Sequence, residues 1–259
     1  MSWNMPITVE TCVASHIGDR HEQQDRVGVF AHPRQRGTMI AVLADGMGGH
    51  TGGAIAAEQV LLKARQNFES YAPQNESPND LLAEIVNDAH LIIRLTRLTS
   101  EKEPHSTAVV LVLQPGHVRW AHCGDSRLYH FRGAELVSRS ADHSLVGELL
   151  RRGRLNEAGA RVHPQRNVLL SCLGGEKAPE VVISEPVKPQ AGDSFLLCSD
   201  GLWGHLSDAE IGAAVATRRA REAAEVLVDR ARQRAGGYGD NISLALIKIV
   251  DAASLTSQP

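Results

Sequence analysis

The sequence predicts an α+β protein in which helices and strands form separate layers. Short β-type runs occur in groups, and amphipathic helical segments occur in pairs between those groups, so single strands and helices do not alternate along the chain. This order favours a layered sandwich of largely antiparallel sheets over a doubly wound parallel sheet. The 259 residues, 42% of them hydrophobic, suffice for one large core-bearing unit, and we predict a single domain over residues 1–259.

Strands are predicted where short apolar runs lie between Gly, Asp or Pro residues. These runs are residues 39–43, 108–113, 118–122, 127–131, 195–198 and 242–250, with a further run at 26–30. Runs of this length, bounded by turn-forming residues, are typical of strands. Together they predict an extensive β framework.

Helices are predicted from apolar residues at helical spacing and from capping signals. Two stripes mark a pair of amphipathic helices: Ala57, Leu61, Ala64 and Phe68, then Leu82, Ile85, Ala89 and Ile92. Ser207 followed by Glu210 is a capping-box pattern that predicts the start of a later helix. Another helix is predicted through residues 222–235, ending before Gly236.

Residues 144–165 do not fit this regular pattern. They are rich in Arg and Gly with weak strand character, so we predict a mobile surface excursion. Its arginines have two open interpretations, solvated surface charge or a surface that receives a phosphorylated segment: Arg151, Arg152, Arg154 and Arg161. The tail over residues 251–259 is predicted to fray.

The composition argues against several classes of protein. Lys and Arg total 27 against 30 Asp and Glu, a net charge of -3 that offers no broad basic field for nucleic acid or an anionic membrane. Apolar runs are far shorter than the roughly 20 residues of a membrane helix, and residues 1–10 carry no secretory pattern. We therefore expect a cytoplasmic protein that binds neither nucleic acid nor membrane.

The four cysteines are scattered and show no C-x-x-C spacing for zinc or redox chemistry. We expect buried thiols at these positions: Cys12, Cys123, Cys172 and Cys198.

Acidic residues lie at the ends of four predicted strands: Asp25, Asp45, Asp200 and Asp240. If those strand ends meet, the carboxylates converge and repel one another unless cations are bound. A ligand set made of oxygen donors suits Mg²⁺ or Mn²⁺ better than Zn²⁺. An Asp-Gly pair after a strand is also common in ordinary turns, so this pattern alone leaves the turn interpretation open.

Seven short motifs contain or accompany these acids. They read RHEQQD at 20–25, DGMGGH at 45–50, STA at 106–108, GDSR at 124–127, DHS at 142–144, LCSDGL at 197–202 and DNIS at 240–243. In this order the set resembles the PPM family, the type 2C metal-dependent serine/threonine protein phosphatases, and in particular its compact stand-alone bacterial members. The resemblance covers about residues 8–250. It implies a four-layer α-β-β-α sandwich, with two largely antiparallel sheets face to face, helix pairs outside, and a flap at 144–165.

The resemblance also implies two tightly bound ions, Mn²⁺ or Mg²⁺. Asp45 would bridge them, and the backbone carbonyl of Gly46 would complete one of their shells. Asp200 and Asp240 would hold the first ion.

Three further roles follow from the same resemblance. Asp25 would reach the second ion mainly through water, and Asp125 would share a third, weaker ion with Asp200. Arg20 would grip the substrate phosphate, a role that suits the bidentate guanidinium fork.

The implied mechanism is hydrolysis without a phosphoenzyme. Two cations lower the pKa of a bridging water, which attacks phosphorus while the cations and Arg20 neutralise the phosphoryl oxygens. We expect the catalytic residues to be Arg20, Asp45, Asp200 and Asp240. No cysteine lies in a C-x5-R segment, which argues against a thiolate mechanism.

The proton donor to the leaving group stays open. Several eukaryotic relatives in the family carry, as the proposed leaving-group acid, a His where this chain has Met47, as many bacterial members do. His50, His143 and His205 are candidates because His titrates near neutral pH, yet each could instead be structural, and a metal-bound water could serve.

The resemblance implies a monomeric protein-serine/threonine phosphatase that reverses a separate Ser/Thr kinase, with secretion control as one pathway it could serve. A non-catalytic phosphoprotein-binding module and a small-molecule phosphatase on the same fold are the alternatives. Retention of every motif aspartate favours an enzyme.

Overall fold

The computed structural model describes residues 7–49, 52–98 and 103–251. Its strands form two sheets, and every strand pairing among these residues is antiparallel. One sheet has the order β1 (Ile7–His16), β11 (Ile242–Asp251), β10 (Asp193–Cys198), β7 (Arg127–Arg132), β8 (Glu135–Arg139). The other has the order β2 (Asp25–Ala31), β3 (Met39–Met47), β5 (Ala108–Gln114), β6 (His117–Cys123), β9 (Val182–Ile183), with β4 (His105–Ser106) paired to β3.

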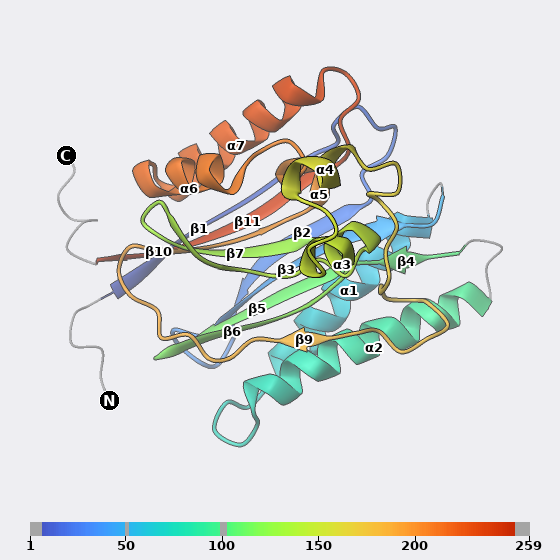
Figure 1. Ribbon diagram of the computed structural model, residues 1–259. Helices are drawn as coiled ribbons and strands as arrows, with labels where there is room; N and C mark the ends of the chain where they lie inside the picture. The colour runs from blue at the N-terminus through green and yellow to red at the C-terminus, as the bar shows by residue number, and fades with distance from the viewer. Residues whose placement is uncertain (1–6, 50–51, 99–102, 252–259) are drawn as a thin grey trace.

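Helix pairs cover the outer face of each sheet (Figure 1). The six-stranded sheet packs against α1 (Gly52–Ser70) and α2 (Pro78–Leu98), and the five-stranded sheet packs against α6 (Asp208–Thr217) and α7 (Ala220–Ala235). A short helix, α5 (Asp200–Trp203), follows β10. The order of layers is therefore helix, sheet, sheet, helix, which confirms the predicted α+β sandwich.

Three apolar cores hold the four layers together. In β3, Ile40 and Val42 face the helix pair, whereas Ala41 and Leu43 face the other sheet. Successive side chains of a strand point to opposite faces, so a strand buried on both sides must be apolar at nearly every position. This is why the central strands appear in the sequence as continuous apolar runs.

The predicted strands and helices are present, but the sequence did not indicate the short elements β4 and α5 or the strands β1, β8 and β9. Edge strand β1 is largely half-buried or exposed, β8 has an exposed start, and β9 is two residues long, so none carries a strong apolar run. The capping box of Ser207 with Glu210 is confirmed, and Gly236 ends α7 in the left-handed conformation at φ 60°.

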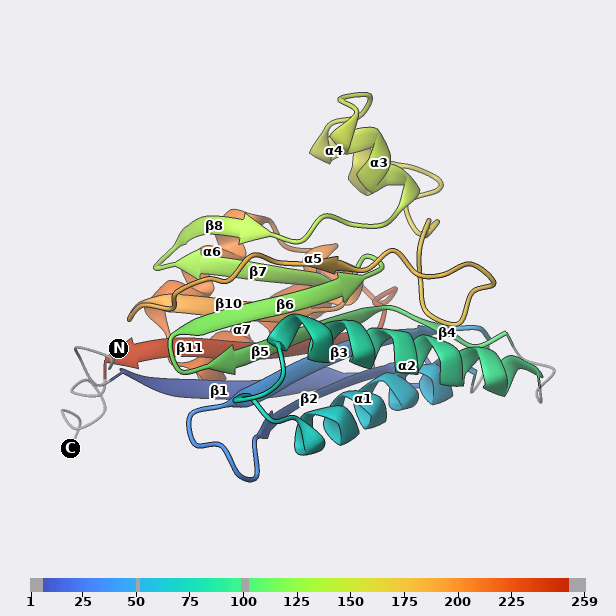
Figure 2. The same cartoon turned by 90° about the horizontal axis from the view of Figure 1, so that it is seen from below.

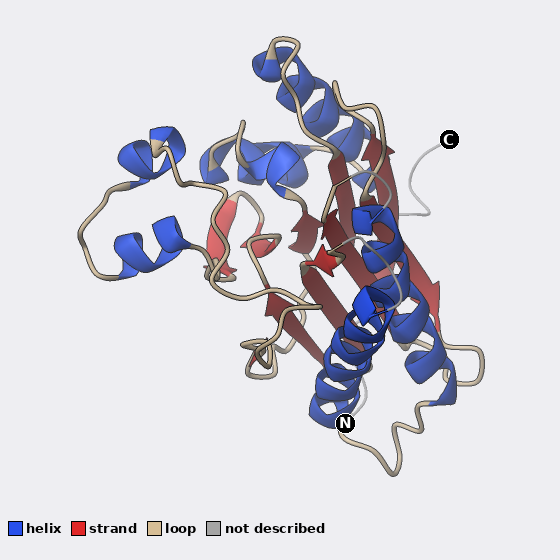
Figure 3. Cartoon of the chain, turned by 90° about the vertical axis from the view of Figure 1, so that its right-hand side faces the viewer, coloured by secondary structure: helices blue, strands red, loops and turns tan. Residues whose placement is uncertain are grey.

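The excursion predicted at 144–165 contains two short helices instead of an irregular segment. These are α3 (Leu145–Arg151), capped by Ser144, and α4 (Glu157–Val162), capped by Asn156. Figures 2 and 3 show both helices projecting from the sandwich. The chain rejoins the body where Ser144 pairs with Leu169, so the excursion, called the flap below, extends slightly beyond its predicted end.

Other predictions have mixed outcomes. Cys123 and Cys198 are buried, but Cys12 and Cys172 are only partly buried, so the prediction of four buried thiols is wrong for these two. No described helix combines the length and apolar character that a membrane crossing requires. The predicted fraying of the tail concerns residues 252–259, outside the described residues, and the single-domain division stays a prediction.

The inter-sheet core generates the first test. Leu197 in β10 is 0% exposed between the sheets, whereas Leu98 at the end of α2 is 82% exposed. Leu197→Ala should lower the free energy of unfolding by about 2–5 kcal/mol, because it leaves a cavity between two rigid sheets. Leu98→Ala should change it by less than about 0.5 kcal/mol. Urea unfolding of both variants measures this, and similar losses would contradict the placement of the core.

Candidate active site

Strand register brings the two aspartates of the six-stranded sheet together. Asp25 opens β2 and lies directly opposite Asp45 of β3 in the antiparallel ladder. Opposite residues in such a ladder have Cβ atoms roughly 5 Å apart. The pairing of β2 with β3 thus gives one end of this sheet two neighbouring carboxylates.

The other sheet presents its acids at the same end of the sandwich. Cys198, the last residue of β10, pairs with both Leu244 of β11 and Arg127 of β7. Asp200 therefore follows one strand where Asp240 and Asp125 precede its two neighbours. Three segments that are far apart in sequence therefore each place one acid at the same end of the five-stranded sheet.

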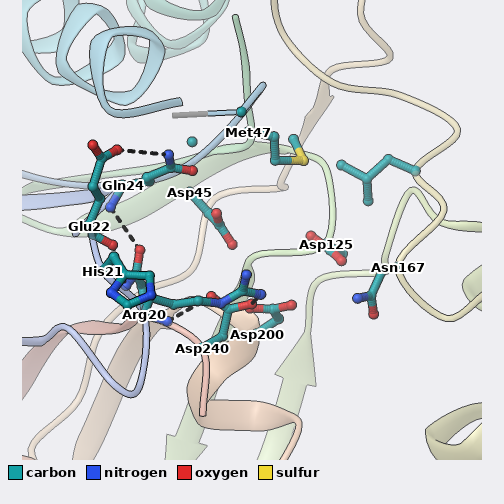
Figure 4. Close-up of a pocket in the computed structure, with 14 residues that line it drawn as sticks. Arg20, His21, Glu22, Gln24, Asp45, Met47, Asp125, Asn167, Asp200 and Asp240 are labelled. Carbon is teal, nitrogen blue, oxygen red and sulfur yellow. Dashed lines mark hydrogen bonds and ion pairs between the residues drawn. The ribbon is translucent and has the colours of Figure 1, made fainter. Parts of the chain in front are cut away.

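Four of these five acids, Asp45, Asp125, Asp200 and Asp240, share one cleft of about 560 Å³. In Figure 4 the side chains of Asp45, Asp125, Asp200 and Asp240 surround a common space. The full lining is Arg20, His21, Glu22, Gln24, Asp45, Gly46, Met47, Gly49, Asp125, Asn167, Leu169, Asp200, Asp240 and Asn241. Among the predicted site residues, only Asp25 is not part of this lining.

Asp25 lies just behind the cleft. Its side chain is 2% exposed, and its Oδ2 accepts a hydrogen bond of 2.8 Å from the Ser199 hydroxyl. Its Oδ1 is buried without a hydrogen-bond partner. Burial raises the pKa of Asp25 to about 6, partly offset by that hydroxyl. A buried carboxylate that lies opposite Asp45 in the ladder and has one oxygen without a hydrogen-bond partner is suited to reach a cation through water.

The electrostatics of the cleft are unfavourable without cations. Burial, and then the charges of the other aspartates, raise the pKa values of Asp45 and Asp200 well above their usual range. Burial and the charge of Asp142 raise the pKa of Asp125 to about 7. Neighbouring carboxylates oppose one another's ionisation, so a bound positive charge would stabilise the whole group.

Arg20 supplies one positive charge at the rim. Its guanidinium forms an ion pair of 2.5 Å with Asp240, whose side chain is 37% exposed. The sequence predicts that Arg20 binds a substrate phosphate. In this structure Arg20 instead pairs with Asp240, which is a predicted metal ligand.

Gly46 allows the backbone itself to reach the cleft. A Cβ atom at this position would lie 2.0 Å from the carbonyl oxygen of Gly53 and 2.8 Å from that of Gln24. No side chain fits there, and the peptide lines the cleft beside Asp45. Close backbone packing therefore requires glycine here, and Gly46 is a backbone group that lines the cleft beside a predicted metal ligand.

The donor set fits hard divalent cations. It consists of carboxylate and carbonyl oxygens, the ligands Mg²⁺ and Mn²⁺ prefer, and the open Oδ1 of Asp25 lacks any other partner. In the described part of the chain, no group of three or more His, Cys, Asp or Glu residues is placed so that these side chains alone could hold a metal ion. A cation bound in this cleft would therefore need water and a backbone carbonyl, in addition to carboxylates, to complete its coordination.

The candidate proton donors lie elsewhere, as far as they are described. His143 is 2% exposed, accepts a hydrogen bond from the Gly124 amide and stacks on His122 at 4.8 Å, so it is structural. His205 is half-buried and does not line the cleft. His50 is outside the described residues.

Sequence reasoning missed several lining residues, most notably His21, Asn167 and Leu169. His21 is exposed and follows Arg20 directly, so its place inside the RHEQQD motif could have identified it. Asn167 and Leu169 come from the end of the flap, where no local pattern indicates a return to the site.

Comparison with known proteins identifies the family. Residues 13–235 match the family described as Protein phosphatase 2C. The chain is 33% identical to the serine/threonine phosphatase stp of Listeria welshimeri over 238 residues, covering 88% of this chain and 91% of stp. It is 32% identical to the serine/threonine protein phosphatase PstP of Mycobacterium tuberculosis over 225 residues, covering 86% of this chain but only 43% of PstP. This chain thus spans less than half the length of PstP.

Solved structures agree with this result. A serine/threonine phosphatase of S. agalactiae superposes with a TM-score of 0.82 at 28% identity, covering 94% of this chain and 100% of that one. The catalytic domain of PstP in complex with 2 manganese ions superposes with a TM-score of 0.77 at 27% identity, covering 95% of this chain and 100% of that one. PppA of Pseudomonas aeruginosa, described as a key regulatory component of T6SS, superposes with a TM-score of 0.76 at 27% identity, covering 93% of this chain and 97% of that one.

The family match, the relatives above 30% identity and the shared sandwich agree with the acidic cleft. The predicted fold class and the predicted class of enzyme, a metal-dependent serine/threonine phosphatase, are confirmed, and the chain belongs to the protein phosphatase 2C family.

Proposed function

We propose that this chain hydrolyses phosphoserine and phosphothreonine in proteins, using the acidic cleft at the end of the two sheets. The observation that carries the proposal is the meeting of four aspartates and Arg20 in one cleft, with Asp25 directly behind them. An oxygen-rich, negatively charged cleft cannot bind a phosphate dianion unless cations neutralise it. Metal dependence and phosphate chemistry therefore belong to the same site.

The aspartates divide into those that hold ions and those that support them. Asp45, Asp200 and Asp240 would hold two ions with the carbonyl of Gly46, and Asp25 would act through water. Asp125, opposite Asp45 across the cleft in Figure 4, would share a third and weaker ion with Asp200. When bound, the ions supply a water of lowered pKa as the nucleophile and neutralise charge on the phosphoryl oxygens.

Arg20 would bind the phosphate. Its guanidinium lines the cleft and carries a charge at any working pH, and its present partner Asp240 is a proposed metal ligand. Once Asp240 engages a cation, the pair with Arg20 weakens and the guanidinium is available to two phosphate oxygens. No other Arg or Lys lines the described cleft.

His21 would give the leaving serine or threonine oxygen its proton. It is the one imidazole among the cleft residues that the structure describes, and it neighbours Arg20 in the chain. Histidine can hold and release a proton near neutral pH, as this role requires. His21 would thus serve the role proposed for the His that several eukaryotic relatives carry at the position of Met47.

The proposed substrates are phosphoproteins, and the proposed partner is a separate Ser/Thr kinase whose products this chain would reverse. Similarity to PppA, described as a regulator of T6SS, supports secretion control as the pathway. The flap arginines are weaker evidence for substrate binding, because Arg151 and Arg152 both pair with Glu148 on their own helix.

Neutralising one acid tests the cluster in two ways. Asp45→Asn and Asp240→Asn should lower hydrolysis of para-nitrophenyl phosphate with Mn²⁺ by at least about 100-fold, since each removes a ligand. In chelator, Asp45→Asn should unfold at a higher temperature than the parent, because burial and then repulsion by the other aspartates raise the pKa of Asp45, and neither penalises a neutral Asn in the same way. Asp229 is exposed on α7, so Asp229→Asn is the matched control and should change neither the rate of hydrolysis nor the unfolding temperature. Retained activity in both cleft variants would contradict the proposal.

The raised pKa of Asp25 predicts a pH dependence in metal-free protein. Its folded pKa of about 6 exceeds the usual value of about 3.9, so the folded state binds this proton more tightly than the unfolded chain. The parent should therefore lose stability as pH rises from about 4 to about 6, by up to about 3 kcal/mol. Asp25→Asn should remove that loss, so its stability relative to the parent should be greater at pH 7.5 than at pH 4.5. Urea unfolding in chelator at both pH values measures it, and a stability difference independent of pH would refute the assignment.

Leaving-group dependence tests His21. His21→Gln should lower kcat for a phosphothreonine peptide about 10- to 100-fold, because an alkoxide needs a proton to leave. The para-nitrophenolate ion leaves without one, so turnover of para-nitrophenyl phosphate should change little. His205→Gln, outside the cleft, is the control. Equal losses with both substrates would exclude proton donation by His21.

A further inference from the structure

Behind the cleft, the Thr107 side chain lies between the two segments that carry Asp45 and Asp125. Thr107 is 0% exposed and joins β4 to β5. Its Oγ1 accepts a hydrogen bond of 2.9 Å from the Asp45 amide, and its own amide donates one of 2.9 Å to the Asp45 carbonyl. Thr107 therefore bonds both backbone polar groups of Asp45, and the Ser106 hydroxyl donates a further hydrogen bond of 3.1 Å to the Asp45 carbonyl.

The same hydroxyl reaches the loop that carries Asp125. Thr107 Oγ1 lies 2.8 Å from the Ser126 Oγ, and Ser126 is 1% exposed. Because Oγ1 already accepts the Asp45 amide, its remaining hydrogen-bonding capacity goes to Ser126. One oxygen atom thus connects the peptide of Asp45 to the residue that follows Asp125.

The methyl group of Thr107 has a separate task. Gly124, at φ 103°, packs so closely that a Cβ atom there would lie 2.6 Å from Thr107 Cγ2. The loop containing Asp125 therefore closes against the methyl while its Ser126 side chain bonds to the hydroxyl. Substitution can separate these contacts, since Val keeps the shape without the hydroxyl and Ser keeps the hydroxyl without the methyl.

We propose that Thr107 is a positioning residue that sets the relative placement of the Asp45 and Asp125 carboxylates, and hence the affinity of the cleft for divalent cations. The inference rests on the proposed function, because it assumes that both aspartates serve in ion binding. Thr107 does not line the cleft, so it touches neither substrate nor reacting atoms. Substitution of a buried residue with a purely structural role would change only the stability of the fold. Substitution of a positioning residue changes the affinity for cations by more than its effect on stability explains.

Calorimetric titration with Mn²⁺, with thermal unfolding in chelator, tests this. Thr107→Val should weaken Mn²⁺ binding about tenfold or more, the scale seen when a partner of a metal ligand is lost. Thr107→Ser, the conservative variant, should bind Mn²⁺ more tightly than Thr107→Val although it loses the packing against Gly124. Val110→Ala, in the adjoining strand β5 and 0% exposed, is the stability control, which should unfold at a lower temperature with the parent's Mn²⁺ affinity.

Ser126→Ala tests the connection itself. It should weaken Mn²⁺ binding, and the double variant Ser126→Ala/Thr107→Val should lose less affinity than the sum of the two single losses. Both changes break the hydrogen bond between Thr107 and Ser126, and Thr107→Val also removes the acceptor of the Asp45 amide. Parent-like Mn²⁺ affinity in Thr107→Val, affinities that follow unfolding temperature across all variants, or fully additive effects would each overturn the proposal. If Thr107→Val does not fold, Ser126→Ala still decides it: weaker Mn²⁺ binding than the parent supports the proposal, and parent-like Mn²⁺ affinity overturns it.

Failure of the proposed function would look different. A parent protein that binds Mn²⁺ but hydrolyses no phosphopeptide would refute the function, while the binding series would still decide the role of Thr107. A parent that binds no Mn²⁺ would overturn both.

Discussion

The structure depends on repulsion between carboxylates that the fold forces into one cleft. Asp45 and Asp200 are held by strand ends that cannot move apart without breaking a sheet, and burial makes their ionisation unfavourable. Proteins rarely keep such a cluster unless a ligand offsets it, and cations are the ligand that an oxygen-only set attracts. Phosphate binding follows from the same requirement, since only a cleft neutralised by cations can accept a second anion.

The two sheets fix the relative positions of the carboxylates that repel one another. Each sheet contributes acids at one end, and the apolar core between them fixes the distance across the cleft. Supporting contacts come from residues that never reach the cavity: Ser199 holds Asp25, and Thr107 holds Asp45. The arrangement explains why residues as distant in the chain as Arg20 and Asp240 meet in an ion pair. Stability of the core and affinity for cations are thereby properties of the same scaffold.

Much of this could be predicted from the sequence. Central strands such as β3 and β10 are apolar on both faces, and acids at their ends are visible as breaks in the apolar runs. Edge strands and the flap helices were missed because their burial is partial and their patterns are weak. The pairing of Arg20 with Asp240 and the contribution of Asn167 depend on contacts between remote segments, which no local pattern encodes. The residue roles themselves stay predictions.

The most direct measurement is the anomalous diffraction of Mn²⁺ in crystals of this protein. The account predicts at least two strong peaks in the cleft, with one ion in contact with Asp45, Asp200 and Asp240 and both in contact with Asp45. A weaker peak beside Asp125 should appear as the Mn²⁺ concentration rises. Mn²⁺ peaks only outside the cleft, or a cleft that stays without them at saturating Mn²⁺, would contradict the central claim.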